Sequence, residues 1–483
     1  MIAFKSIFYI IGILLSIIAC AMVIPFLSEL VFWKAKSSSA FLSSIFLTGF
    51  TGGALVLANK PKGKVEIKVR EAFLLTTLSW VSICFFASFP FSLSKPGLGF
   101  LDALFESTSA LTTTGESIFS RFDKVSKGIF LWRALLQWLG GIGIIVMAMT
   151  VLPILKIGGM QLFRSEFSDR SEKILPKVTQ IAKAIMITYA GLTFCCWFFL
   201  RLAGMNGFDA LCHALSTLST GGLSTYGASI GHFKSPAIEW TIGFFMLLGG
   251  STLLLFVKLW HKDFKSVLKD AQLRDYLVIV LVATVLITCW RFMNHPLDFF
   301  ESFRKSFFMV VSFITTTGFT LNDYDKWGGF SNTIFFMLSF IGGCTGSTTG
   351  GIKIFRFQIL FEIVKSHLRQ LRRPHGVYIP LYQGQKIETS VAISVFTFFS
   401  LYGFIYLVLS VLLGLCGLDM LSALSGANVC LGNLGIGFGG FGPTASPGDL
   451  NDGAKMIMMA GMILGRLELL GVLVLLLPTF WRD

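Results

Sequence analysis

The residues that could do chemistry in this chain are concentrated in four short segments, each of which ends at a glycine and lies between two long apolar runs. The segments are LDALFESTSALTTTG ending at Gly115, FDALCHALSTLSTGG ending at Gly222, KSFFMVVSFITTTG ending at Gly318 and LSALSGANVCLGNLG ending at Gly435. A duplicated transporter scaffold would predict repeated apolar spans, but not TTTG-like endings at one place in each unit. We therefore predict a repeated unit of helix, re-entrant pore segment and helix.

These residue types suit the binding of an alkali cation. A potassium ion must exchange its water shell for oxygens of comparable field strength, and four backbone loops that meet on one axis supply rings of carbonyls. A terminal glycine permits a positive φ, which can direct carbonyls inward without a β-carbon clash. The C-terminal, negative end of each pore helix would also favour a cation. The threonines that could contribute carbonyls are Thr113, Thr114, Thr220, Thr316 and Thr317.

Acidic residues on or near the pore helices could be ion ligands or helix caps. Glu106 is expected within the first one, and Asp102, Asp209 and Asp419 are expected near helix starts. Side-chain oxygens at such starts commonly accept hydrogen bonds from free backbone N–H groups. We therefore predict N-terminal caps there in preference to ion ligands.

Composition places the whole chain in a membrane. It has 483 residues, of which 54% are hydrophobic and 14% are charged, and its mean hydropathy is +0.74. A soluble surface needs about 25–35% charged residues, so a water-soluble enzyme is excluded. The net charge of +14 is spread among the apolar segments and does not predict nucleic-acid binding. Dispersed histidines and nine cysteines without a CxxC pair predict no metal catalysis, no disulfide framework and no organic cofactor.

Apolar runs long enough to cross about 30 Å of hydrocarbon predict ten full passes. They cover residues 5–32, 40–59, 71–92, 131–155, 180–203, 237–259, 276–293, 330–361, 389–415 and 453–480. Every second connection is rich in Lys and Arg, which is typical of cytoplasmic loops. Both termini are therefore predicted in the cytoplasm, and the four re-entrant segments are predicted to enter from outside.

A small-residue sequence, GGCTGSTTGGIK from Gly342 to Lys353, interrupts the second span of the third unit. It resembles a phosphate-binding loop, but Ile352 stands where that motif needs lysine, so nucleotide binding is not predicted. Irregular backbone at membrane depth is tolerated only where it is buried or lines a watery cavity. A loop directly beneath the filter satisfies both conditions.

Arg466 is an isolated positive charge in the last span. Such charges normally face a pathway or a partner. Glu468 would lie on a different face of the same helix, so a pair between the two is not expected. We favour Arg466 as an electrostatic barrier beside the loop over a structural salt bridge.

With these motifs, and LGRLE around Arg466, the chain resembles the superfamily of potassium transport proteins that comprises TrkH, TrkG, KtrB and HKT, and most closely TrkH, over essentially its whole length. The resemblance implies a homodimer with a pore in each subunit, gated by a cytosolic, nucleotide-binding regulator of the TrkA type. It identifies the loop as the intramembrane gate, and the spans at 5–32 and 40–59 as an additional N-terminal pair. The implied potassium-binding residues are Thr113, Thr114, Gly115, Thr220, Gly221, Gly222, Thr316, Thr317, Gly318, Asn433, Leu434 and Gly435, and the implied gating residues are Gly346, Ser347, Thr348, Thr349, Gly350, Gly351 and Arg466.

The resulting prediction is an all-α integral membrane protein of the bacterial inner membrane, not an enzyme, with a pseudo-fourfold pore that takes up K⁺. An alternative is a secondary transporter with a substrate site at the broken helix near 342–351, although no span offers a convincing midplane acid for coupling. The predicted units are an N-terminal helix pair at 1–70 and pore repeats at 71–178, 179–275, 276–387 and 388–483.

Overall fold

The computed structural model describes residues 4–33, 37–61, 63, 67–95, 97–150, 178–294, 298–321, 324–443 and 447–482. Within these ranges the chain is helical except for loops and one antiparallel hairpin, Leu381–Tyr382 with Gln385–Lys386. The prediction of an all-α fold is confirmed. The predicted basic connection at 156–177 lies outside the described residues.

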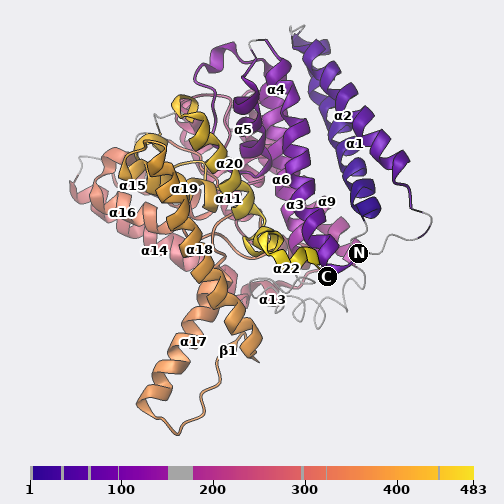
Figure 1. Ribbon diagram of the computed structural model, residues 1–483. Coiled ribbons are helices and arrows are strands. Elements are labelled where there is room, and N and C mark those ends of the chain that lie inside the picture. The colour runs from indigo at the N-terminus through magenta and orange to yellow at the C-terminus, as the bar shows by residue number, and fades with distance from the viewer. Residues whose placement is uncertain are drawn as a thin grey trace.

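The N-terminal pair forms a helical hairpin at one edge of the molecule (Figure 1). Helix α1, Phe4–Ser28, continues as a π-helical turn, Glu29–Trp33, and packs against α2, Ser38–Ala58. At the crossing, a β-carbon added to Gly12 would lie 2.8 Å from the carbonyl oxygen of Gly52. Small residues of this kind let helix backbones approach closely in membranes.

The helices that follow repeat one order four times: a long helix, then a helix that carries one of the predicted pore segments and is called the pore helix below, then one or more further helices. The first unit has α3 (Val69–Ala87), α4 (Phe89–Leu93), the pore helix α5 (Phe100–Leu111) and α6 (Lys127–Thr150). The second has α9 (Val178–Leu202), the pore helix α10 (Gly207–Leu218), α11 (Pro236–Gly249) and α12 (Leu253–Trp260), and α13 (Phe264–Leu268) follows it.

The third and fourth units repeat this order. The third has α14 (Ala271–Asn294), the pore helix α15 (Phe299–Ile314), α16 (Gly329–Leu338) and α17 (Ile354–Arg372). The fourth has α18 (Thr389–Leu415), the pore helix α19 (Met420–Gly432), α20 (Asp452–Arg466), α21 (Leu470–Leu473) and α22 (Pro478–Arg482). Helix α17 and the hairpin project away from the body of the molecule (Figure 1).

The predicted interruption of the span at 330–361 is confirmed, and two more of the ten predicted passes are also broken. Seven helices in the described part of the chain are long and apolar enough to cross a membrane. The remaining three predicted spans are broken: α11 and α12 meet at 91°, α20 and the helical turn after it meet at 106°, and a loop separates α16 from α17. The first bend follows from chain packing, because the backbone N–H of Cys344 donates to the carbonyl of Gly250 between α11 and α12, at 2.9 Å.

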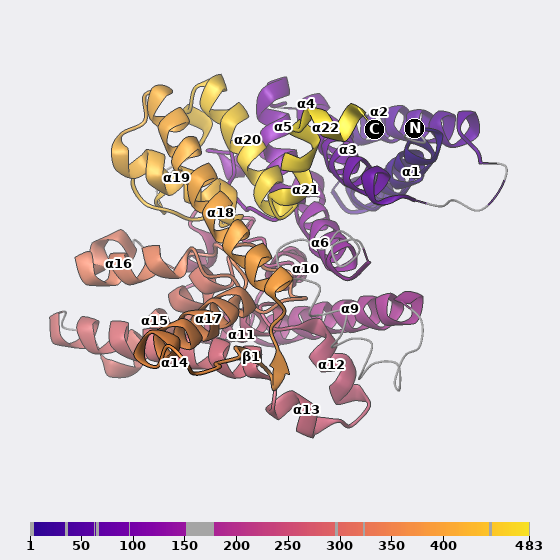
Figure 2. The same ribbon diagram turned by 60° about the horizontal axis from the view of Figure 1, so that its bottom comes forward.

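The four units are arranged around one central region (Figure 2). The second helix of a unit packs against the pore helix of the next, as α6 does with α10, α11 with α15, and α20 with α5. The pore helices are therefore enclosed by protein. Large apolar side chains on α1, α2, α9, α14 and α18 remain exposed on the outside, including Phe46, Phe194 and Leu281. Such a surface suits lipid contact, and the chain is an integral membrane protein.

Candidate functional site

The four predicted filter segments meet in a closed ring. Each terminal glycine lies so close to the backbone of a neighbouring segment that a β-carbon would not fit. The close approaches run from Gly115 to Gly221, from Gly222 to Thr317, from Gly318 to Gly435 and from Gly435 back to Thr114. Segments that are far apart in the sequence thus follow one another around an axis in chain order.

Residues with a positive φ, which is the left-handed region, recur in each segment of the ring. Gly115, Gly222 and Gly318 have φ values of +90°, +75° and +84°, as the sequence predicts. Gly435 does not, so the expectation of a positive φ at all four glycines was wrong there. Gly435 has a steric role instead, because a β-carbon on it would lie 2.6 Å from the carbonyl oxygen of Thr114.

A second set of left-handed residues was missed by the sequence reasoning. The residue two positions before each terminal glycine has a φ between +51° and +55°, although none of the four is glycine. These residues are Thr113, Thr220, Thr316 and Asn433. Asparagine tolerates this conformation better than most residues, so Asn433 suits the position even though it breaks the threonine pattern.

The ring presents carbonyl oxygens that lack protein donors. Of the twelve residues predicted to bind K⁺, only Gly221 has a carbonyl that accepts a hydrogen bond from the described part of the chain, from Gln137 Nε2 at 2.6 Å. Buried carbonyls in proteins are nearly always paired. Gly115, Gly222 and Gly435 are half-buried, whereas the threonines behind them are buried. The arrangement provides a set of oxygen ligands for a cation.

Side-chain hydrogen bonds stabilise the first and third segments internally and join the fourth segment to the first. The hydroxyls of Thr112 and Thr114 lie 2.8 Å apart, and those of Thr315 and Thr317 lie 2.7 Å apart. Asn433 Nδ2 donates to Thr114 Oγ1 at 3.0 Å, which joins the fourth segment to the first. The asparagine therefore supplies a side-chain link between the fourth segment and the first.

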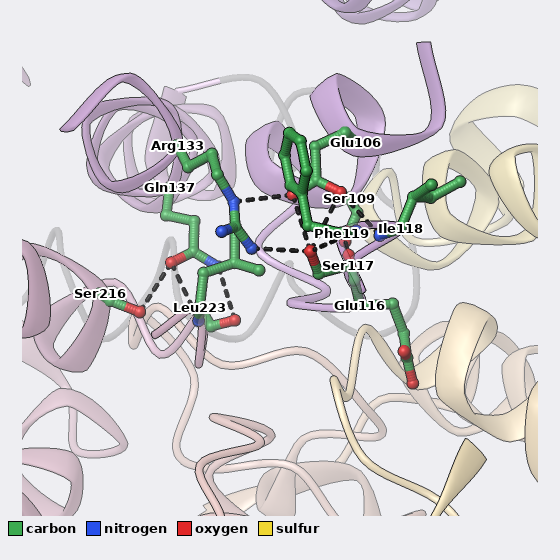
Figure 3. Close-up of polar contacts among 11 residues, drawn as sticks. Glu106, Ser109, Glu116, Ser117, Ile118, Phe119, Arg133, Gln137, Ser216 and Leu223 are labelled. Carbon is green, nitrogen blue, oxygen red and sulfur yellow. Dashed lines mark hydrogen bonds and ion pairs between the residues drawn. The ribbon is translucent and has the colours of Figure 1, made fainter. Parts of the chain in front are cut away.

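Behind the first filter segment lies a buried ion pair between α6 and α5 (Figure 3). Arg133 Nε lies 2.7 Å from Glu106 Oε1, and Arg133 Nη2 donates to Ser117 Oγ at 2.9 Å. Glu106 also accepts from the backbone N–H of Ile118 at 2.9 Å. Ser117 and Ile118 follow the first filter segment, and their contacts with this ion pair hold them against the pore helix α5.

Gln137, one turn after Arg133 on α6, supports the second filter segment (Figure 3). Its Oε1 accepts from Ser216 Oγ at 2.7 Å and from the backbone N–H of Leu223 at 3.4 Å, and its Nε2 donates to Gly221. Sequence reasoning missed both α6 residues. Their i, i+4 spacing in an otherwise apolar span could have indicated a functional role, because polar groups within membranes face partners or pathways.

The acidic residues near the pore-helix starts have different roles. Asp419 is an N-cap, as predicted, and accepts from the backbone N–H of Ser422 at 3.3 Å. The cap prediction was wrong for Asp102, which forms an ion pair with Lys455 at 2.7 Å. It was also wrong for Asp209, which accepts from the hydroxyls of Thr225 and Tyr226, while Asn206 caps that helix. The contacts of Asp102 and Asp209 could not be read from position in the helix alone.

The Gly-rich loop between α16 and α17 lies directly against the inner end of the ring. Gly350 donates its backbone N–H to Thr316 Oγ1 at 2.8 Å, and Thr220 Oγ1 donates to Thr348 Oγ1 at 3.1 Å. Thr348 Oγ1 also donates to the carbonyl of Leu218 at 3.0 Å. A β-carbon on Gly350 would meet the carbonyl of Gly432. The loop therefore contacts the second, third and fourth segments.

Within the loop, the hydroxyls and glycines stabilise an irregular backbone. Ser347 Oγ lies 2.8 Å from Thr349 Oγ1, which accepts from the backbone N–H of Gly343 at 3.0 Å. Gly346 and Gly351 have φ values of +76° and +65°. Lys353, which sequence reasoning did not single out, donates to the carbonyl of Thr349.

Arg466 links this loop to the first unit. Its Nη1 donates to the carbonyl of Thr348 at 3.0 Å and its Nη2 donates to the carbonyl of Gly140 at 3.3 Å. The side chain is buried, and it forms no ion pair with any described residue. Glu468 pairs with Arg356 instead, so the expectation that it does not pair with Arg466 is confirmed; the expected reason was wrong, because α20 ends at Arg466 and Glu468 follows in the bend with a φ of +57°. The alternative of a structural salt bridge at Arg466 thus has no carboxylate in the described chain to support it.

A cavity of about 30 Å³ lies between the loop and the last helices. Its lining includes Gly350, Lys353, Asn433 and Arg466. This volume accommodates about one water molecule, whereas sites for organic ligands enclose roughly 300–1,000 Å³. The cavity counts against the alternative in which the broken helix binds an organic substrate.

Known proteins resemble this chain over its whole length. The family model TrkH, described as a cation transport protein, matches residues 36–481. The Trk system potassium uptake protein TrkI of Halomonas elongata is 40% identical over 98% of this chain and 96% of its own length, and TrkH of Escherichia coli K12 is 36% identical over 99% and 100%. The crystal structure of the potassium transporter TrkH from Vibrio parahaemolyticus matches with a TM-score of 0.91 at 35% identity, over 99% of this chain and 100% of that one.

Proposed function

We propose, from the premise that this chain belongs to the TrkH family of cation transport proteins, that it takes up potassium ions across a bacterial inner membrane. The observation that carries the proposal is the closed ring of four glycine-ended segments whose carbonyls, apart from that of Gly221, have no hydrogen-bond donor in the described chain. The names of the relatives, which are potassium uptake proteins, support K⁺ as the transported ion.

The proposed filter binds K⁺ through backbone carbonyls in successive layers. Rings of carbonyl dipoles replace the hydration shell of the ion. The residues are Thr113, Thr114, Gly115, Thr220, Gly221, Gly222, Thr316, Thr317, Gly318, Asn433, Leu434 and Gly435. The oxygen of Gly221 also accepts from Gln137, which helps to position the second segment.

The proposed gate is the loop beneath the ring together with the positive charge of Arg466. An ion that leaves the filter inward would meet Thr348 and Gly350, which are bonded to filter threonines. The guanidinium of Arg466 would add an electrostatic barrier, because it lies in low dielectric without a counter-charge among the described residues. The remaining gate residues are Gly346, Ser347, Thr349 and Gly351.

The proposed assembly is a homodimer that a cytosolic, nucleotide-binding regulator of the TrkA type controls. The two ends of the chain lie close together in both views (Figures 1 and 2), which supports one side of the membrane for both, and the basic connections favour the cytoplasmic side. We retain the units 1–70, 71–178, 179–275, 276–387 and 388–483 as the proposed division of the chain. Cross-linking in native membranes and co-purification with the regulator would test the assembly.

The test of this function is uptake of K⁺, Rb⁺, Na⁺ and Li⁺ by liposomes that contain the purified chain. We expect K⁺ and Rb⁺ to enter faster than Na⁺ and Li⁺. Gly115→Ser should reduce this preference, because Gly115 has a φ of +90° and its β-carbon would fall against the carbonyl of Gly221. Gly403→Ala is the control, since a β-carbon there meets nothing within 4 Å. Equal Na⁺ and K⁺ flux through the unaltered chain would contradict the filter.

A further inference from the structure

Glu116 directly follows the first filter glycine, at a position where the other segments have apolar residues. The residues after the other three terminal glycines are Leu223, Phe319 and Ile436. Ser109 Oγ donates to the backbone carbonyl of Glu116 at 2.6 Å, and Ser312 Oγ donates in the same way to the carbonyl of Phe319 at 2.7 Å. The supporting hydrogen bond therefore needs no particular side chain, and the fold at this position does not require a carboxylate.

The side chain of Glu116 is unpaired although it is 93% buried, with an exposed fraction of 7%. It forms no ion pair and no side-chain hydrogen bond with the residues that the structure describes. The nearby Arg133 is paired with Glu106, and the side chain of Glu116 points away from both (Figure 3). The titratable groups whose charge interacts with it through space are Glu106, Tyr324 and Cys430, none of which is a cation.

A buried carboxylate without a counter-charge is costly, so such groups are normally paired or bound to a metal ion. The phenol of Tyr324 donates to the carbonyl of Gly437 and is therefore not a donor to Glu116. Gly115, the adjacent residue, is half-buried, and Glu116 itself keeps an exposed fraction of 7%, so the residue that carries the carboxylate adjoins an accessible part of the ring. Carboxylate oxygens are ligands that hard cations prefer.

We propose that Glu116 forms a cation site at the outer mouth of the ring, which binds one K⁺ or Rb⁺ before it enters the filter. This inference rests on the proposed function and deepens it. A fixed negative charge at the entrance raises the local concentration of cations. Its effect is largest at low external concentration and low ionic strength, where screening is weak. The filter itself still determines the choice between K⁺ and Na⁺, because its carbonyls are unchanged.

The experiment measures Rb⁺ uptake by proteoliposomes as a function of external Rb⁺ concentration at constant low ionic strength. It compares the unaltered chain with Glu116→Gln, which removes the charge and keeps the shape. Asp449→Asn is the matched control, because Asp449 is an exposed carboxylate in the connection between α19 and α20, on the same predicted side. We expect the half-saturating Rb⁺ concentration to rise by about tenfold in Glu116→Gln, with the Rb⁺ to Na⁺ preference unchanged and Asp449→Asn unaffected.

An unchanged half-saturating concentration in an active Glu116→Gln protein would overturn the site, as would an equal shift in Asp449→Asn. Failure of the unaltered chain to transport Rb⁺ would instead reject the proposed function. If Glu116→Gln is inactive, thermal unfolding in detergent with increasing RbCl replaces the flux assay. If the site exists, RbCl should raise the Tm of the unaltered chain and of Glu116→Asp, whereas low RbCl concentrations should not raise the Tm of Glu116→Gln. Equal rises in Tm in the unaltered chain, Glu116→Asp and Glu116→Gln would reject the site.

Discussion

Gln137 holds the second filter segment from a helix of the preceding unit. The amide uses both of its ends, because Oε1 accepts from Ser216 and Leu223 while Nε2 donates to Gly221. A β-carbon on Gly221 would collide with this amide, so glycine at 221 and glutamine at 137 are matched in size. The side chain therefore fixes the position of one carbonyl in the proposed filter.

We predict that Gln137→Leu lowers the K⁺ to Na⁺ preference severalfold, because Gly221 loses its donor and the segment can relax. Gln137→Glu keeps the acceptor for Ser216 and Leu223 but repels the carbonyl of Gly221, and should have a similar effect on selectivity. Ion competition in liposome flux measures both. Trp138→Phe is the control, since Trp138 Nε1 bonds only to Thr193. Native selectivity in Gln137→Glu would contradict the role of the Gly221 contact.

At the scale of elements, the second helices of three units are interrupted where they pass the inner end of the ring. The bends of 91° and 106° and the loop between α16 and α17 fall at this level. Arg466 is the last residue of α20, at the second bend, and its two hydrogen bonds join the loop to α6. A single side chain thus holds the loop in place and supplies its charge.

We predict that Arg466→Ala increases K⁺ flux severalfold, because it removes both the charge and the contact with Thr348. Arg466→Lys should keep part of the barrier, since a positive charge remains without the planar donor fork. The control is Arg291→Ala, which removes a buried arginine that stacks on Trp327 and bonds to Ser302. Flux and Tm are measured on the same samples. Lower Tm without a gain in flux would show that Arg466 is only structural.

At the scale of the molecule, the ring is closed where the fourth unit meets the first. Lys455 at the start of α20 pairs with Asp102 at the start of α5. Arg304 and Glu239 make a similar pair between the third and second units, at 2.6 Å. The ion pairs lie at the ends of helices, while the filter contacts lie near the centre. Neighbouring units are thus joined both by ion pairs at helix ends and by the contacts of the ring.

We predict that Asp102→Asn destabilises the protein by about 1–2 kcal/mol, because it leaves the buried Lys455 without a counter-charge while Asp102 itself is partly exposed. The double variant Asp102→Lys with Lys455→Asp should recover part of this loss. Thermal unfolding in detergent measures both, with Asp123→Asn, an exposed aspartate in the connection after the filter, as the control. Equal Tm in Asp102→Asn and the unaltered chain would show that the pair contributes nothing.

The sequence by itself determined the membrane class, the four glycine-ended segments and the loop that interrupts the third unit. These features depend on local composition, since apolar length, glycine endings and runs of small residues can each be read within about 20 residues. The tolerance of Asn433 for a left-handed backbone could also have been read, from residue type alone.

Only the tertiary structure decided which polar groups meet. Arg466 and Gly140 are 326 positions apart, and Asp102 and Lys455 are 353 positions apart, so no local pattern relates them. The same applies to the bends of α11 and α20, which look like continuous apolar spans in the sequence but follow from contacts with the loop and the ring. The pairing of polar groups and the bending of helices depend on how the four units pack around the ring. That packing depends on distances between segments that are far apart in the sequence, so the sequence order alone does not give it.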